Sequence, residues 1–301
     1  MRITAKGVVN RDQEVTFLFD SKPYKGFVGD TVASALLAND VNLVGRSFKY
    51  HRPRGILGIG SEEPNALISV HKGGKIDPNV RATTQEIYEG LIVTSQNSWP
   101  SLKFDALAVN DILAPFFSAG FYYKTFMWPP RFWEALYEPI IRRAAGLGKL
   151  ESEPDGDNYD QNFAFCDLLI IGGGPSGLFS ALLAGRAGLD VILVDENPKF
   201  GGRLLFENTI IDGNHCLDWI QSCLGELKSL KNVRLLSRAT VFGIYDQGTF
   251  GVLERISRHI QDSESDAVLD CFWRIVASNC LLASGAIERH IAFGNNDRPG
   301  I

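Results

Sequence analysis

A six-residue glycine-rich segment is the part of this sequence whose residue types and spacing indicate chemistry most clearly. It matches the G-x-G-x-x-G pattern and reads Gly172-Gly173-Gly174-Pro175-Ser176-Gly177. The first glycine permits a tight strand-to-helix turn, the second lets the backbone approach a pyrophosphate, and the third lets a helix pack closely on the strand. The N–H groups at the start of that helix favour phosphate binding. The segment therefore predicts a site for an adenine dinucleotide, NAD or FAD.

The elements on either side must position this segment, and their pattern supports the same interpretation. The apolar run 168–171 predicts a buried strand, a helix is expected after the glycines, and 191–194 predict a second strand. That strand ends at Asp195, whose carboxylate can accept hydrogen bonds from a ribose and repel a 2′-phosphate, which disfavours NADP. Glu196 is adjacent and could share or take this role. The pattern serves NAD and FAD alike and does not separate them.

Two further segments are expected to lie against the same cofactor. Phe200-Gly201-Gly202-Arg203 resembles the loop that lies along the dinucleotide in two-dinucleotide-binding flavoproteins. Residues 280–286 predict a short apolar strand, and its Ser-Gly end resembles the Ala-Thr-Gly segment that returns to the first β-α-β unit in such proteins. Beyond the glycine segment, the predicted cofactor contacts are Asp195, Glu196, Gly202, Arg203, Ser284 and Gly285.

Composition limits the classes of function. The net charge of −5 predicts no general affinity for nucleic acid. An apolar fraction of 45% and a charged fraction of 22% are typical of a globular protein, here of about two domains. The five cysteines lack metal-binding spacing, and with no secretory signal they predict a reducing compartment, the cytoplasm. No apolar run is long enough to cross a bilayer. We find no residue set with catalytic or metal-binding spacing, so we predict no catalytic residues and no metal ligands.

The N-terminal residues predict a β-grasp domain, with a hairpin over 14–28 and a helix over 31–39 that is capped by Asp30. The block 46–55, RSFKYHRPRG, resembles a segment of ferredoxin-like domains attached to certain flavin oxidases and dehydrogenases. In their iron–sulfur members the block is followed by C-x4-C-x2-C, because a [2Fe–2S] cluster needs thiolate ligands. The matching positions here are Gly58, Glu63 and Ala66. We therefore predict a ferredoxin-like fold without a cluster.

Three segments of the first half have no single assignment to a function. The basic residues of 46–54 could hold a phosphate or an acidic partner, or form a solvated turn with arginine–carboxylate pairs. Within them His51 has no identifiable partner, so it is not predicted to be a catalytic base. The aromatic-rich residues 116–137 could pack between the domains or against another subunit. Residues 151–162 are acidic and polar and predict an exposed linker.

The remaining pattern completes a mixed α/β and α+β fold. A helix is predicted over 215–230, and the short strands predicted to form a β-rich meander are 232–237, 240–245 and 251–259. The predicted parts are a β-grasp domain without a cluster (1–98), an aromatic connecting segment with the linker (99–162), and a Rossmann-like FAD/NAD(P)-binding domain that is incomplete at its C-terminus (163–301).

Three features together resemble the α subunit of heterotetrameric sarcosine oxidase. They are the block 46–55, Ser61-Glu62-Glu63-Pro64-Asn65-Ala66 in place of the cysteines, and Cys166-Asp167 ahead of the glycine segment. The resemblance runs from about residue 1 to residue 301. It implies a part in the oxidation of sarcosine to glycine, with oxygen reduced to hydrogen peroxide. The one-carbon unit then leaves as formaldehyde or as methylene-tetrahydrofolate.

The resemblance also implies cofactors and partners. NAD would contact Gly172, Gly174, Gly177 and Asp195, and it is not expected to take hydride from the substrate. The partners would be β, γ and δ subunits, with FAD in the β subunit and FMN at the α/β interface. In that family the turn matching residues 296–300 lies inside the nucleotide domain, and a tetrahydrofolate-binding domain follows later. We therefore expect a fragment or a split gene product, inactive alone, without the folate domain.

Two other interpretations stay open. Subunits of opine oxidase, proline or hydroxyproline dehydrogenase and hydrogen cyanide synthase resemble this architecture and would place FAD at the glycine segment, although they often keep the cluster cysteines. A non-catalytic assembly module with a structural dinucleotide is also consistent with the aromatic segment and the missing redox residues. The sequence does not identify the amine substrate.

Overall fold

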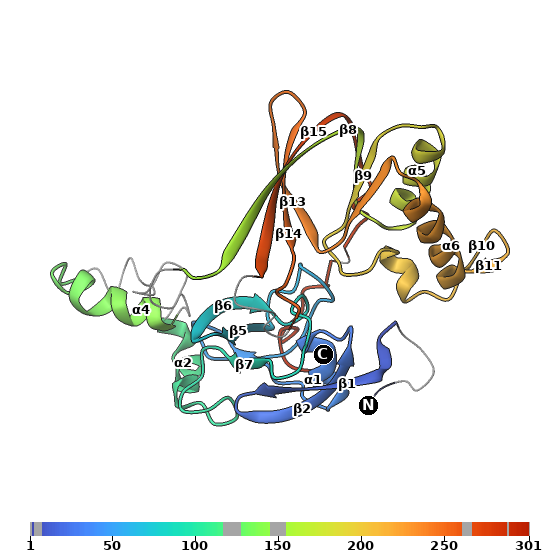
Figure 1. The fold of residues 1–301 in the computed structure, drawn as a ribbon. Helices are drawn as coiled ribbons and strands as arrows, with labels where there is room; N and C mark the ends of the chain where they lie inside the picture. Colours follow the sequence, from blue (N-terminus) through green and yellow to red (C-terminus); the bar gives the residue numbers. More distant parts are fainter. Residues whose placement is uncertain are drawn as a thin grey trace. The chain divides into compact units, whose positions relative to one another are not determined.

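The computed structural model describes residues 2, 8–116, 128–144, 155–260, 267–287 and 289–300. Two compact units are formed, and they are coloured along the chain in Figure 1. The first consists of Met1–Thr4, Val9–Pro154 and Arg289–Ile301, and the second of Ala5–Val8 and Asp155–Glu288. The main segment of the second unit thus begins inside the predicted linker, and the last residues belong to the first unit. None of the described helices is long and apolar enough to cross a bilayer.

The first unit is a β-grasp fold, as the hairpin and helix pattern predicted. Its five-stranded sheet has the order β2-β1-β7-β5-β6, with β1 and β7 parallel and the other neighbours antiparallel. The strands are β1 (Asn10–Phe19), β2 (Lys22–Val28), β5 (Leu67–Lys72), β6 (Lys75–Arg81) and β7 (Ile92–Ser95). Helix α1 (Val32–Ala38) buries Leu36 in one core with Phe17 and Ile68.

The start of α1 differs from the prediction by one residue. The N-cap is Thr31, whose hydroxyl accepts from the Ser34 N–H while the Ser34 hydroxyl accepts from the Thr31 N–H, a capping box. Asp30 lies just outside and is buried. Its carboxylate accepts from the Phe27 N–H at 2.9 Å and from the Ser34 hydroxyl at 2.7 Å. Asp30 therefore fastens the turn before the helix.

Short elements complete the first unit. Two residues each form the antiparallel pair β3 (Gly45–Arg46) and β4 (Pro53–Arg54). The later elements are η1 (Ala106–Ala108), α2 (Val109–Ile112), η2 (Ala114–Phe116), η3 (Trp133–Tyr137) and α4 (Glu138–Ala144). Much of the aromatic segment, residues 117–127, lies outside the described residues, so its two interpretations both stay open.

The second unit is built on a six-stranded sheet of order β12-β9-β8-β15-β14-β13. The first four strands are parallel, and β14 and β13 continue the sheet antiparallel. The strands are β8 (Asn158–Ile171), β9 (Val191–Val194), β12 (Val233–Leu236), β13 (Ala239–Tyr245), β14 (Thr249–Arg255) and β15 (Val268–Leu282).

Three predictions about these strands were wrong in detail. β8 begins at Asn158, inside the predicted linker, and β15 is a 15-residue strand instead of a short one near residue 280. The outer half of β8 begins with polar residues (158–162), and the apolar residues of the outer half of β15 are interrupted by Asp270 and Arg274, but the two strands pair with each other along most of their length. β12 is the parallel edge strand beside β9 and does not belong to the meander, which consists of β13, β14 and β15.

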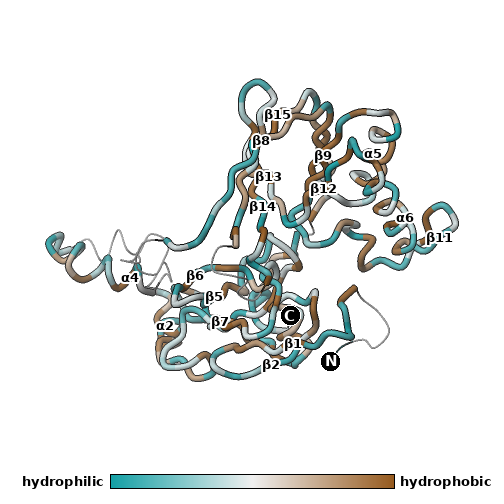
Figure 2. The backbone as a smooth tube through the Cα atoms, viewed as in Figure 1, coloured by the Kyte–Doolittle hydropathy of each residue, from teal (hydrophilic) through white to brown (hydrophobic). Residues whose placement is uncertain are grey.

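Two helices cover one face of the parallel strands. They are α5 (Pro175–Arg186) and α6 (Cys216–Ser229), and η4 (Gly202–Leu205), β10 (Ile210–Ile211) and β11 (Asn214–His215) lie between β9 and α6. Leu178 of α5 and Leu227 of α6 share a core with Ile170 and Leu193 of the sheet. All four residues of β9 are buried, and Figure 2 shows this strand as a hydrophobic segment. Burial on both faces is typical of parallel strands.

The opposite face of the parallel strands packs against the meander. Leu169 and Val194 share a second core with Phe250 and Val252 of β14. The other side of the meander, with the adjoining half of β8, exposes aromatic rings; we name it the aromatic sheet face, and its rings are Phe163, Phe165, Phe242 and Phe272.

Candidate dinucleotide-binding site

The glycine segment forms the turn between β8 and α5. The Gly172 N–H donates to the Val194 carbonyl at 2.8 Å, which ties the turn to the end of β9. Gly174 is the N-cap residue of α5, and Pro175 takes the first helical position, where its missing N–H costs nothing. No side chain caps this helix. Its N-terminal N–H groups can therefore bind an anionic ligand.

A Cβ placed on each motif glycine shows why the glycine is needed. At Gly172, where φ is +106°, the Cβ would lie 2.3 Å from the carbonyl oxygen of Ala283. On Gly177 it would lie 1.8 Å from the Gly172 carbonyl oxygen, so α5 could not pack this closely. On Gly174 it would meet no atom within 4 Å. The first and third glycines serve the fold, whereas the second borders open space at the helix N-terminus.

Asp195 is buried and already holds the turn together. Its Oδ2 accepts from the Gly173 N–H at 2.6 Å, and its Oδ1 accepts from the backbone and side-chain N–H groups of Asn197 at 2.8 and 3.0 Å. An ionised carboxylate offers about four acceptor positions, so one position on Oδ2 is left for a ribose hydroxyl. The neighbouring Glu196 is exposed. Which of the two contacts a ribose stays a prediction.

The two flanking segments lie against the glycine turn. The Gly201 N–H donates to the Gly173 carbonyl at 2.8 Å, and a Cβ on Gly202 would lie 3.0 Å from the Cα of Gly174. The Ala283 N–H donates to the Ile171 carbonyl at 2.8 Å, which brings the end of β15 to the end of β8. The predicted site residues exposed around the turn are Pro175, Ser176, Glu196, Arg203, Ser284 and Gly285.

Arg203 makes its contact away from the turn. Its Nε lies 2.8 Å from Glu207 Oε1 in an exposed pair one helical turn away. Such pairs contribute little to stability, so the guanidinium can exchange this partner for a phosphate at small cost. Its cofactor role stays a prediction.

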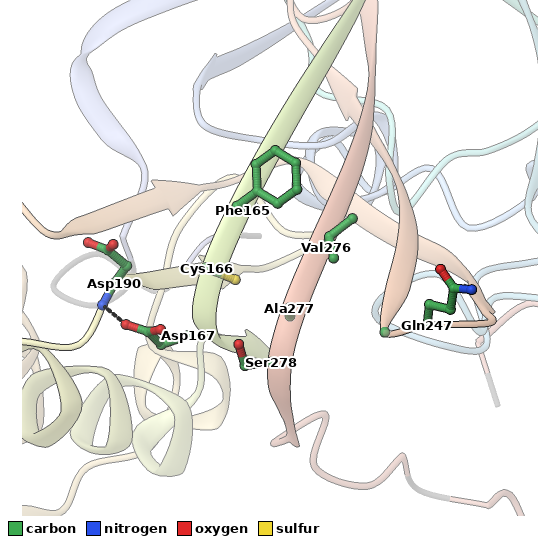
Figure 3. Close-up of a pocket in the computed structure, with 9 residues that line it drawn as sticks. Phe165, Cys166, Asp167, Asp190, Gln247, Val276, Ala277 and Ser278 are labelled. Carbon is green, nitrogen blue, oxygen red and sulfur yellow. Dashed lines mark hydrogen bonds between the residues drawn. The ribbon is translucent and has the colours of Figure 1, made fainter.

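A hollow elsewhere in the second unit does not belong to this site. It has a volume of about 520 Å³, and Figure 3 shows its lining by β8, β15 and the β13–β14 turn. The Asp190 N–H donates to Asp167 Oδ2 at 2.9 Å at its edge, just before β9 begins. Ligands of open α/β sheets bind at the carboxyl ends of the strands, the opposite edge. Burial raises the pKa of the Cys166 thiol in this hollow to about 11.

The basic block 46–54 forms pairs inside the first unit. Arg52 Nη2 and Arg54 Nη1 lie 3.2 and 2.8 Å from the carboxylate oxygens of Asp297. His51 is buried, with Nδ1 2.8 Å from Asp105 Oδ2. These contacts confirm the interpretation as arginine–carboxylate pairs. Sequence reasoning missed the partners of His51 and the arginines because they lie 54 and more than 240 residues away.

Comparison with known protein families gives one match in each of the two units. Residues 12–98 match the family described as 2Fe-2S iron-sulfur cluster binding domain, and residues 167–242 match the family FAD dependent oxidoreductase. Among the described residues, no three His, Cys, Asp or Glu side chains form a group that could hold a metal ion. L-proline dehydrogenase from P. horikoshii has a similar fold, with a TM-score of 0.61, 20% identity, and coverage of 97% of this chain and 44% of that one.

Similar sequences cover the whole chain. The sarcosine oxidase alpha subunit of Rhizobium meliloti is 56% identical over 300 residues, which are 100% of this chain and 30% of that protein. Its counterpart in Corynebacterium sp. (strain U-96) is 34% identical over 99% of this chain and 26% of its own length. An opine oxidase subunit of Agrobacterium tumefaciens is 28% identical over 46% of this chain and 27% of its own length. The chain thus spans about 30% or less of these relatives. Over its whole length it is homologous to part of the sarcosine oxidase alpha subunit, with a ferredoxin-like domain and an FAD-dependent oxidoreductase domain.

Proposed function

We propose that the second unit binds one adenine dinucleotide, NAD, at the glycine turn, and that the chain is part of an alpha-type subunit of a sarcosine-oxidising complex. The observation that carries the cofactor proposal is the open space at Gly174, directly before the uncapped N-terminus of α5. Sequence similarity to two sarcosine oxidase alpha subunits along nearly the whole chain supports the rest.

The residues of the site have separate tasks in this proposal. The N–H groups at the start of α5, from Ser176 onward, bind the pyrophosphate. Asp195 or Glu196 accepts hydrogen bonds from the adenosine ribose and excludes a 2′-phosphate. Gly202, Arg203, Ser284 and Gly285 border the bound molecule. A dinucleotide supplies redox chemistry only through its nicotinamide or flavin ring, and this chain binds and orients the adenosine diphosphate part.

The reaction of the complex is proposed on similarity alone. Sarcosine would be oxidised to glycine in the β subunit, with peroxide and formaldehyde or methylene-tetrahydrofolate as products. FAD in that subunit, FMN at the α/β interface, and the γ and δ subunits complete the proposed assembly. We assign no catalytic residue to this chain.

The test is to purify the whole complex with the subunit that contains this chain, denature it, and identify the released nucleotides by mass spectrometry. One NAD per complex, besides the flavins, is expected. Release of no dinucleotide attributable to this subunit would overturn the cofactor proposal. Sarcosine-dependent peroxide formation that does not require this chain would overturn the assignment to the complex.

A second candidate is an FAD-binding subunit of an opine oxidase, a proline or hydroxyproline dehydrogenase, or a hydrogen cyanide synthase-like complex. The match of residues 167–242 to FAD dependent oxidoreductases and the similarity to the opine oxidase subunit favour it. A yellow subunit that releases FAD would support it over the first candidate. A panel of sarcosine, proline and opine substrates then identifies the amine that reduces the flavin.

A further inference from the structure

A buried carboxylate fills the loop in which the matching iron–sulfur family carries its cysteines. The Glu63 side chain is almost completely buried, with 1% of the residue exposed. Its Oε2 accepts from the N–H groups of Leu57 at 2.7 Å and Gly58 at 2.5 Å. Its Oε1 accepts from those of Asn65 at 2.7 Å and Ala66 at 3.0 Å. One side chain thus gathers both ends of the loop 57–66.

The neighbouring Glu62 repeats this arrangement nearer the surface. Its Oε1 accepts from the N–H groups of Ile59 and Gly60, both at 3.1 Å. Four successive N–H groups, from 57 to 60, therefore point at carboxylates. Such runs of N–H groups form anion-binding concavities, which in other proteins hold phosphates and iron–sulfur clusters. Here the anions belong to the loop itself.

The loop does not fit a [2Fe–2S] cluster. Cluster irons need thiolate ligands, and the sequence has no cysteine before Cys166, in the second unit. A Cβ on Gly58 would lie 3.3 Å from the Glu63 backbone, so even the space at that position is tightly filled. An isolated buried carboxylate would be very unfavourable, but charge-assisted hydrogen bonds from four N–H groups compensate for its lost hydration.

We propose that the Glu63 carboxylate replaces the cluster as the anion around which the loop 57–66 folds. The ferredoxin-like domain then reaches its native structure without iron and carries no electrons. It acts as a scaffold inside a redox protein. This inference does not depend on the dinucleotide site, which lies in the other unit.

The test compares the Glu63→Gln variant with the wild type in the full-length subunit. An amide keeps the shape but turns an NH2 group toward two N–H donors, which leaves those donors unsatisfied. Hydrogen exchange of the peptide that covers 57–66 is expected to become at least about tenfold faster, since a lost 1.4 kcal/mol is a factor of ten. The Glu62→Gln variant is the matched control, with a smaller effect because its carboxylate is partly exposed. Dinucleotide content is expected to be unchanged in both variants.

Iron analysis of the wild type completes the test and does not depend on how the variants fold. The purified protein, incubated anaerobically with ferrous iron and sulfide and then desalted, is expected to retain neither. Stoichiometric iron and sulfide in the first unit would overturn the proposal, as would unchanged exchange of the loop in Glu63→Gln. If that variant does not fold, Glu63→Asp, which keeps the charge on a shorter side chain, is expected to fold with intermediate exchange. Exchange of that variant equal to the wild type would contradict the required geometry.

Discussion

A methyl group added at Gly174 is expected to disturb dinucleotide binding without disturbing the fold. A Cβ at this position meets nothing in the protein and φ is −72°, so Gly174→Ala is expected to fold normally, with a change in stability within about 0.5 kcal/mol. The added methyl group enters the space that the pyrophosphate needs. Dinucleotide affinity is therefore expected to fall by roughly tenfold or more, about 1.4 kcal/mol, measured by nucleotide retention after gel filtration.

The matched control is Gly177→Ala, which places a methyl group 1.8 Å from the Gly172 carbonyl oxygen. It is expected to lower the melting temperature of the second unit, because α5 must move away from β8. If Gly174→Ala retains as much dinucleotide as the wild type, the ligand does not approach this glycine, and the proposed site is wrong.

The thiols provide a prediction about pH. The thiolate is the reactive form, and burial, helped by the charge of Asp167, raises the pKa of Cys166 to about 11. At pH 8 only about one Cys166 thiol in a thousand is ionised, and the fraction rises about tenfold per pH unit up to pH 11. Because this pKa exceeds that of the unfolded chain, the associated stability is present below about pH 9 and is lost as pH rises toward 11.

Thiol labelling followed by peptide mapping checks this order of reactivity. Cys280 is exposed and is expected to react first at pH 8, whereas the other four cysteines are buried. The Cys280→Ser variant is expected to remove the fast reaction and leave Cys166 unmodified at this pH. Modification of Cys166 as fast as Cys280 at pH 8 would contradict the burial of Cys166.

Among the elements, local patterns predicted β9 at its observed residues, α1 and α6 to within one residue at each end, and α5 as a helix that follows the glycines. An apolar run before glycines and a periodic stripe are properties of neighbouring residues, so the sequence contains them directly. The long outer halves of β8 and β15 could not be predicted in this way. The outer half of β8 begins with polar residues and, among the described strands, pairs with β15, while the outer half of β15 lies between β8 and β14.

In the candidate site, too, some features follow from the local sequence and others depend on contacts between distant residues. The glycine turn follows from residue spacing alone, whereas the burial of Asp195 depends on the N–H groups of Gly173 and Asn197. The role of Glu63 was equally hidden, since a glutamate in a loop is usually solvated. Contacts that join distant residues, such as His51 with Asp105, leave no local pattern to find.

The segment 289–300 is tied to the β4 region of the first unit by ion pairs. Asp297 lies between Arg52 and Arg54, and each partly exposed pair contributes about 0.2–1 kcal/mol. Asp297→Asn is expected to speed hydrogen exchange of this segment severalfold and to lower the stability of the first unit by about 1 kcal/mol. Arg298→Gln is the control with little effect, because its contact with Asp111 is long, at 3.5 Å, and partly exposed. Unchanged exchange in Asp297→Asn would show that other contacts hold the segment.

In the molecule as a whole, the aromatic sheet face is an apolar surface of the second unit that the described residues leave open to solvent. Phe165 and Phe163 are 79% and 67% exposed. Large exposed apolar patches promote association and bind apolar dyes. Phe165→Ser is expected to reduce dye fluorescence and self-association of the isolated chain, with a change in stability within about 0.5 kcal/mol.

The matched control is Phe250→Ser on the opposite, buried face of the same sheet. Losing this ring from the core is expected to cost about 3–5 kcal/mol and to unfold the unit or lower its melting temperature strongly. Equal effects of the two substitutions on stability would mean that the aromatic sheet face is buried in the isolated chain.

The long pairing of β8 with β15 has a consequence for biosynthesis. The paired residues lie about 110 positions apart in the sequence. A ribosome adds about 5–20 residues per second, so the outer half of β8 waits on the order of 10 s for its neighbour to emerge. During that interval the outer half of β8 lacks its neighbour in the sheet, and Phe163 and Phe165 lie on an unpaired segment, which favours aggregation. We therefore expect this stretch of the nascent chain to be prone to aggregation until β15 has been synthesised and pairs with β8.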